Sequence, residues 1–393
     1  MQRIGIIIAG FLSLAVAWPA TAQQKATLNL VTAGDQNMVD YVKDYLAPIF
    51  EKEHPGIAVK AVGTGPGDAG SQKIYEKLEA EKDNNSWDID VAVIHQKAAG
   101  EMVTKGLLAR YVPDVPTGKL ATSDGAKRAL GADVDGYVIP MFNSQTAIAY
   151  NTMMVKDPPA TYAALEKWVE QNPKKFGYNG IKGGMSGVSF VVGWLYAHTQ
   201  DADRLIKGPY DPDSKKGWDQ ALAQLATFNK NVVLTPGNAG TLDMLNRGEI
   251  AMGPVWVDMF CTWQADGKIP PTVKLKLIGP GMPGQPMYYV VPAKAANAKL
   301  AKEFVALATS PKVQADGIVK RFNWYPGIDA AAVKAQLDEA TWQKLFVDVT
   351  PRGPRDEGEA IPDRTLLQRH PGELRAQGAV AARREAHRCK EYQ

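Results

Sequence analysis

Residues 245–256 read Leu-Asn-Arg-Gly-Glu-Ile-Ala-Met-Gly-Pro-Val-Trp, and this stretch with its continuation to residue 311 decides the fold. A helical segment follows, then a predicted strand (273–278) and a crossing rich in proline and glycine (279–286). A short strand (288–291) and a helix (297–309) complete it. This order is one way to carry a chain out of one lobe into another, with Trp256 facing the gap. We therefore expect a ligand to be captured between two lobes.

The amino terminus carries an export signal. One positive charge in Met1-Gln2-Arg3 precedes an almost wholly apolar run over residues 4–17, and Ala20-Thr21-Ala22 has the small-x-small pattern that signal peptidase cleaves. The apolar run is shorter than the ~20 residues that span a bilayer. We therefore expect a Sec signal peptide over residues 1–22, cleavage near Ala22/Gln23, and a soluble periplasmic chain with no membrane insertion after cleavage.

Composition narrows the function classes. The full chain has 393 residues and a net charge of +3, which is too weak and too evenly mixed to predict a nucleic-acid partner. Cys261 and Cys389 are the two cysteines, and we expect both to be unpaired. The five histidines show no metal-binding spacing, so no metal and no cofactor are predicted.

The amino-terminal part alternates predicted strands with predicted helices. The strands are 27–31, 57–62 and 89–94, and the helices are 37–52, 72–82 and 97–105. This alternation indicates an α/β lobe with a mainly parallel sheet. Ligands of such sheets lie beyond the carboxyl ends of the strands, where the loops 33–36, 63–70 and 95–96 are expected.

A second lobe is predicted from the extended segment 136–151, whose polar middle Asn143-Ser144-Gln145 is expected at the gap between two sheets. Helices are predicted at 162–170, 186–198, 218–229 and 241–246. We assign 23–142 plus 285–326 to lobe 1 and 143–284 plus 327–350 to lobe 2. Residues 351–393 hold eight Arg and one Lys, against six Arg and thirty Lys before them. This tail is either a solvated extension or a foreign end, and no function is assigned to it.

Two glycine motifs favour binding over chemistry. Gly65–Gly70 fits G-x-G-x-x-G, but it follows the second strand and contains Pro66, so a loop offering N–H groups to a small ligand is favoured over a dinucleotide site. Residues 183–187 are not a nucleophile elbow, because Val188 stands where that motif needs glycine. They lead instead into a helix whose amino-terminal N–H groups suit a polar oxygen.

Three elements together resemble the family 1 extracellular solute-binding proteins, which have the type II periplasmic binding fold. They are the segment 136–151, Gly248-Glu-Ile-Ala-Met followed by Trp256, and Val291-Pro-Ala-Lys leading to Ser310-Pro311. The resemblance implies two α/β lobes joined by hinge crossings, a monomer that performs no catalysis, and an inner-membrane ABC permease as partner. Within the family the chain looks nearest to the polyamine- and thiamine-type binders.

The resemblance also implies a site. By position, Asp35, Gln36, His95, Met185, Ser186, Trp256 and Tyr288 match places where such proteins contact ligand. We expect Trp256 and Tyr288 to stack on the ligand, with one of Tyr288 and Tyr289 facing the cleft and the other the core. Hydrogen bonds are expected from Asp35, Gln36, Asn143 and Asp258, and backbone donors from Thr64, Gly65, Met185 and Ser186.

The expected ligand of this chain differs from the ligands of the polyamine- and thiamine-type binders. Polyamine binders use carboxylates at places that look like residues 185–189 and Val290 here, where the chain has none. Glycine loops, Asn, Ser and aromatic faces therefore favour a sugar, a sugar phosphate or a similar polar solute, with a polyamine or thiamine as the alternative. A secreted hydrolase on a two-lobe scaffold and a solute sensor for a receptor remain as alternatives from other classes.

Overall fold

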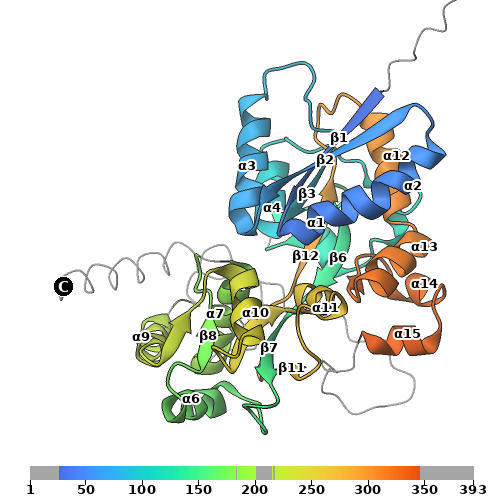
Figure 1. The fold of residues 1–393 in the computed structure, drawn as a ribbon. Helices are drawn as coiled ribbons and strands as arrows, with labels where there is room; N and C mark the ends of the chain where they lie inside the picture. The colour runs from blue at the N-terminus through green and yellow to red at the C-terminus, as the bar shows by residue number, and fades with distance from the viewer. Residues whose placement is uncertain (1–25, 131, 183, 201–214, 216, 346–393) are drawn as a thin grey trace, which may run out of the picture.

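A computed structural model describes residues 26–130, 132–182, 184–200, 215 and 217–345. It has a mixed α/β fold of two lobes, each built on its own sheet flanked by helices (Figure 1). The predicted leader, the arginine-rich tail and Cys389 lie outside the described residues. Within the described part of the chain, no helix combines the length and the apolar character that a membrane crossing requires.

The sheet of lobe 1 has the strand order β13-β6-β12-β3-β1-β2. These strands are β1 (Ala26–Ala33), β2 (Ile57–Gly65), β3 (Val91–His95), β6 (Ile139–Ser144), β12 (Gln285–Val290) and β13 (Tyr325–Pro326). β1 runs parallel to β2 and β3, as the strand–helix alternation predicts. β12, which returns from the other lobe, pairs antiparallel with β3 and β6. All five residues of β3 are buried, as expected for a central strand covered on both faces.

Helices cover both faces of this sheet. The larger ones are α1 (Gln36–Tyr41) continuing through η1 (Val42–Leu46) into α2 (Ala47–Glu53), α3 (Gly67–Ala80), α4 (Gln96–Thr104) and α12 (Ala298–Ala308). α12 buries Ala301, Phe304, Val305 and Ala308, which recur at the spacing of one helix face. The shorter elements are η2 (Val112–Asp114), η3 (Gly118–Leu120), α5 (Asp124–Lys127), β4 (Arg128–Ala129), β5 (Ala132–Asp133), α13 (Pro311–Val313), η5 (Gln314–Arg321), α14 (Ala330–Lys334) and α15 (Glu339–Lys344).

The sheet of lobe 2 has the order β11-β7-β10-β8-β9. Its strands are β7 (Thr146–Asn151), β8 (Phe176–Tyr178), β9 (Val232–Leu234), β10 (Met252–Trp256) and β11 (Val273–Lys276). Around it lie α6 (Tyr162–Gln171), α7 (Met185–His198), α9 (Trp218–Asn229), α10 (Gly237–Asn246) and α11 (Val257–Ala265). α7 is buried from Met185 to Tyr196, because a helix that is apolar all round packs inside a core.

The chain passes between the two sheets at two places. β6 lies in the first sheet and β7 in the second, with Gln145 between them. The return runs from β11 to β12 through residues 277–284, as the stretch quoted first predicts.

Each lobe has its own apolar core. Ile328, Val333, Trp342 and Leu345 belong to the core of lobe 1, although the sequence prediction gave 327–350 to lobe 2. The reason is that these apolar side chains follow β13, the edge strand of the first sheet, and pack beside it. We propose that residues 327–345 form part of lobe 1.

Candidate ligand-binding site

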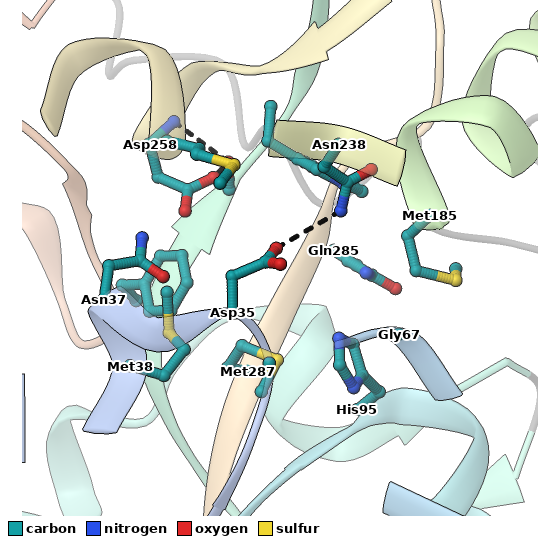
Figure 2. A pocket seen from close by; sticks show the side chains of 15 residues that line it. Asp35, Asn37, Met38, Gly67, His95, Met185, Asn238, Asp258, Gln285 and Met287 are labelled. Atoms are coloured by element: carbon teal, nitrogen blue, oxygen red, sulfur yellow. Dashed lines mark hydrogen bonds between the residues drawn. The ribbon is translucent and has the colours of Figure 1, made fainter. Parts of the chain in front are cut away.

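A cleft lies between the lobes and is lined by side chains from both (Figure 2). The lining residues are Gly34, Asp35, Asn37, Met38, Gly67, His95, Phe142, Ser144 and Gln285 with Met287 from lobe 1 and the crossings, and Met185, Asn238, Trp256, Asp258 and Met259 from lobe 2. The space enclosed is about 40 Å³. A cavity that holds a molecule as small as benzene measures about 150 Å³, so the cleft has to widen before an organic solute can enter.

The pairing of β12 with β3 and β6 determines which side chains form the floor of the cleft. In the antiparallel pairing, Met287 lies opposite His95 on β3 and opposite Phe142 on β6, and Gln285 lies opposite Ser144. Residues opposite one another in a sheet point to the same face, so these five side chains form one surface at the strand ends. The crossing from β6 to β7 begins at the same edge, which brings lobe 2 over this surface.

Asp35 and Asn238 join the two lobes directly. Asp35 follows the last residues of β1, and Asn238 lies in the first turn of α10. Asn238 Nδ2 donates to Asp35 Oδ2 at 3.3 Å, the bond drawn across the middle of Figure 2. Burial raises the pKa of the Asp35 carboxyl, and the bond from Asn238 lowers it in part. The contact therefore holds a partly desolvated carboxylate against the opposite lobe.

Asn238 is itself held by a network in lobe 2. Its Oδ1 accepts from Asn179 Nδ2 at 2.7 Å and from Ser186 Oγ at 2.8 Å, which orients Nδ2 toward Asp35. Gly184 precedes α7 with a φ of +154°. A Cβ there would lie 2.6 Å from Asn238 Oδ1 and 2.7 Å from Asn179 Nδ2, so glycine is what allows this close approach.

Asp258 is the second carboxylate of the cleft. It lies in the first turn of α11, directly after β10 ends at Trp256, and is 7% exposed. Ser144 Oγ, on the other side of the crossing, donates a hydrogen bond to Asp258 Oδ1. The pKa of Asp258 is raised to about 6, chiefly by burial and in smaller part by the nearby charge of Asp35. The bond from Ser144 and the backbone N–H groups of residues 258 and 259 lower it.

His95 and Trp256 complete the predicted lining. Ser71 Oγ lies 3.0 Å from His95 Nδ1 and accepts from the His95 backbone N–H at 3.0 Å, which fixes the imidazole at the end of β3. Trp256 ends β10, where it pairs with Thr146 on β7, and is 7% exposed. Both side chains are held in place by the sheet ends rather than by loops.

Five of the residues expected from the sequence line the cleft, namely Asp35, His95, Met185, Trp256 and Asp258. Ser186 lies behind the lining and acts on it through Asn238. The other five, Gln36, Thr64, Gly65, Asn143 and Tyr288, are not among the lining residues.

Each of these five has a partner elsewhere. Gln36 is exposed and donates to Asp40 along α1. Thr64 Oγ1 donates to the Gly70 carbonyl, and the Gly65 carbonyl accepts from Gly34, because β2 and α3 take up all but one residue of the predicted loop. Asn143 Nδ2 donates to the carbonyl of Pro326 on β13.

Neither Tyr288 nor Tyr289 lines the cleft, contrary to the sequence prediction. Tyr288 is fully buried and donates from its hydroxyl to the Gly125 carbonyl at 2.5 Å. Tyr289 shares a strand face with Gln285 and Met287 but lies two residues deeper, inside the core of lobe 1. The strand end therefore presents Met287 and Gln285 to the cleft instead.

The sequence reasoning missed most of the remaining lining. Gly34, Asn37 and Met38 flank Asp35, and Ser144 belongs to the polar run predicted at the gap, so each lay beside a signal already recognised. Phe142, Met259, Gln285 and Met287 follow from strand register and helix phase. Gly67 lies in the glycine motif. Asn238 has no local signal.

In the part of the chain that the structure describes, the cleft contains neither a metal-binding cluster nor a Ser–His–carboxylate triad. Within the described residues, no three His, Cys, Asp or Glu side chains gather as a metal site would require. Ser71 beside His95 is 1% exposed and does not line the cleft. Ser144, which does line it, donates to a carboxylate rather than to a histidine. The described residues therefore do not form a Ser–His–carboxylate triad at the cleft.

Comparison with known proteins agrees with the two-lobe geometry. The family model for bacterial extracellular solute-binding proteins matches residues 46–345. The chain is similar to a solved structure described as the Atu4243–GABA receptor, at 22% identity over 90% of this chain and 96% of that chain, with a TM-score of 0.63. No curated protein sequence matches the chain.

Two further structures have the same fold at lower identity. A putative spermidine/putrescine ABC transporter from Listeria monocytogenes is 20% identical, covers 81% of this chain and 88% of its own, and has a TM-score of 0.58. Maltose-bound MalE3 of T. maritima is 14% identical, covers 84% and 89%, and has a TM-score of 0.65. At these identities the likeness extends to the fold alone.

Proposed function

We propose that this chain, which belongs to the family of bacterial extracellular solute-binding proteins, captures a small organic solute between its two lobes and delivers it to an ABC permease in the inner membrane. The predicted signal peptide supports the periplasm as the place of capture. The solute-binding family supports a binding role without catalysis.

The observation that carries the proposal is the bond from Asn238 in lobe 2 to Asp35 in lobe 1, within a cleft lined from both sides. A contact that crosses the cleft exists only while the lobes are together. A solute that touches both walls stabilises the same arrangement, so its binding energy shifts the chain toward the closed form. A permease that recognises the closed form would then receive loaded protein.

The two crossings suit this motion. The link at Gln145 and the return at residues 277–284 are the covalent connections between the described sheets. Few residues need to change their backbone angles for a hinge of this kind to open. The two cores have no shared members, so each lobe can move as a body.

A thermal-shift panel on the mature chain tests the proposal. The panel holds the solutes that the descriptions of the similar structures name, which are 4-aminobutyrate, putrescine, spermidine and maltose, together with D-tagatose and a sugar phosphate. A solute at one hundred times its dissociation constant adds about 2.7 kcal/mol to the free energy of unfolding. We expect at least one compound to raise the melting temperature. No shift from any class, together with turnover of a chromogenic ester or glycoside, would favour the hydrolase alternative.

A further inference from the structure

We infer that the cleft selects an organic solute with a positively charged nitrogen on an apolar body. This inference rests on the proposed function and names the solute class for the same cleft. It replaces the preference for sugars that the sequence pattern suggested, because the lining now known differs from the one expected.

Two carboxylates line the cleft, Asp35 from lobe 1 and Asp258 from lobe 2. Among the described lining residues there is no lysine or arginine, and His95 is the one other ionisable side chain. Neither carboxylate forms an ion pair with any described residue. Buried charges in proteins are ordinarily paired, since an unpaired one loses its hydration without compensation. A cation held between the two walls would supply the missing partner to both.

Unsatisfied polar atoms also face this space. Gln285 is 8% exposed and lines the cleft, yet its side chain forms no hydrogen bond with a described residue. Asn37 also lines the cleft, and its buried Oδ1 has no hydrogen-bond partner. The Gln285 amide offers two N–H donors and one acceptor oxygen, so the excess of acceptors comes from Asn37 Oδ1 and the two carboxylates. A solute that donates N–H bonds or carries a positive charge matches this excess, whereas a phosphate or a carboxylate would face repulsion.

Six of the other lining side chains are apolar and polarisable. Met38 and Met287 lie on the lobe 1 side, and Met185 and Met259 on the lobe 2 side. Phe142 and Trp256 add two aromatic rings. Aromatic faces attract cations when both are desolvated, and methionine adapts to irregular apolar shapes. A sugar is uncharged, so it would leave both carboxylates without the counter-charge that a cation supplies.

Matched pairs of probes isolate the charge. Choline and 3,3-dimethylbutan-1-ol have the same shape, but nitrogen with a positive charge replaces carbon in choline. Putrescine and 1,4-butanediol form a second pair of equal length. Thermal shift and calorimetric titration of the mature wild-type chain at pH 7.5 compare the members of each pair. We expect each cation to bind at least about tenfold more tightly than its neutral isostere. Putrescine gains a charge-assisted hydrogen bond to a carboxylate, and choline gains ionic attraction to the carboxylates together with cation–π attraction to the rings.

Two variants connect the result to the cleft. Asp258→Asn removes the charge while keeping an oxygen that accepts from Ser144, and we expect it to weaken cation binding by about tenfold or more. Asp266→Asn makes the same change in net charge at the exposed end of the same helix, where Asp266 pairs with Lys268 at 2.9 Å. This control should bind the cation as the wild type does.

The outcomes separate the inference from the proposed function. Equal binding of a cation and its neutral isostere, or cation binding that Asp258→Asn leaves unchanged, overturns the inference. Shifts that come only from compounds without a charged nitrogen also overturn it, but they leave solute capture in place. No shift from any compound of either panel overturns both.

Discussion

Asp258→Asn should stabilise the unliganded protein, which is an unusual expectation for a change in a buried, hydrogen-bonded residue. Burial raises the pKa of this carboxyl from 3.8 to about 6 in the folded chain. Each pKa unit corresponds to 1.36 kcal/mol, so the ionised side chain costs the folded state about 3 kcal/mol at neutral pH. Asparagine is uncharged, and its Oδ1 still accepts from Ser144.

The stability gained by Asp258→Asn should increase with pH. The folded chain holds the Asp258 proton between pH 3.8 and about 6, whereas the unfolded chain has lost it, so the free energy of unfolding falls as pH rises through this window. The advantage of Asp258→Asn should therefore be about 3 kcal/mol at pH 7.5 and about 1 kcal/mol at pH 4.5.

Thermal or urea unfolding of the ligand-free mature chain, measured at both pH values, tests this expectation. Asp266→Asn serves as the control, and its stability relative to wild type should change little between the two pH values. An Asp258→Asn variant that is less stable than wild type at pH 7.5, or whose difference does not depend on pH, would refute the idea that the cleft holds a destabilising, unpaired carboxylate. The same variant losing cation affinity would show that stability was given up for binding.

Three further predictions follow from the same contacts. Gly187→Ala should lower the free energy of unfolding by about 1–3 kcal/mol in a denaturation curve, because the new Cβ would lie 1.8 Å from the Gly180 carbonyl oxygen. Gly63→Ala, whose Cβ meets nothing closer than 3.6 Å, is the control, and equal losses would contradict the packing described. Asn238→Asp keeps the acceptor oxygen used by Asn179 and Ser186 but places a second carboxylate beside Asp35. Because the two carboxylates repel each other, small-angle scattering of the cation-saturated variant should give a larger radius of gyration than the wild type gives. An unchanged curve would contradict the role of the bond between Asn238 and Asp35 in closure. Cation affinity should fall by up to about tenfold per pH unit below pH 6, as Asp258 gains a proton, and protonation of Asp35, whose pKa is also raised, would act in the same direction. Calorimetry giving one affinity from pH 5 to 8 would exclude the carboxylates as the cation's partners.

The order of helices and strands could be predicted because it depends on local sequence patterns, namely the spacing of apolar residues and the positions of turn residues. Alternating strands and amphipathic helices indicated the first sheet, and the polar run at 143–145 indicated a crossing, where Ser144 now contacts Asp258. Asp35 could be chosen because it follows a predicted strand, at the edge where ligands of such sheets lie. Asp258 lies two residues after Trp256, which was expected to face the gap between the lobes.

The site residues that were wrongly predicted or overlooked have one physical cause in common. Contacts between segments far apart in the sequence cannot be predicted from the sequence pattern of either segment. Strand alternation gave the faces of Tyr288 and Tyr289 but not how far β12 reaches into lobe 1 before the cleft begins, so Met287 was overlooked. Asn238 meets Asp35 across 203 positions of sequence, and only the packing of one lobe on the other creates that contact. The ligand preference changed for the same reason, since Met38, Met259 and Met287, which line the cleft in place of Gln36, Asn143 and Tyr288, come together only in the folded chain.

The most direct test is a crystal structure of the mature protein grown with the tightest-binding cation of the panel. We predict density for the solute between the lobes, with its charged nitrogen beside Asp35 and Asp258 and its apolar part against the methionines and Trp256. Density for the solute elsewhere, or in the cleft with its nitrogen turned away from both carboxylates, would contradict the account.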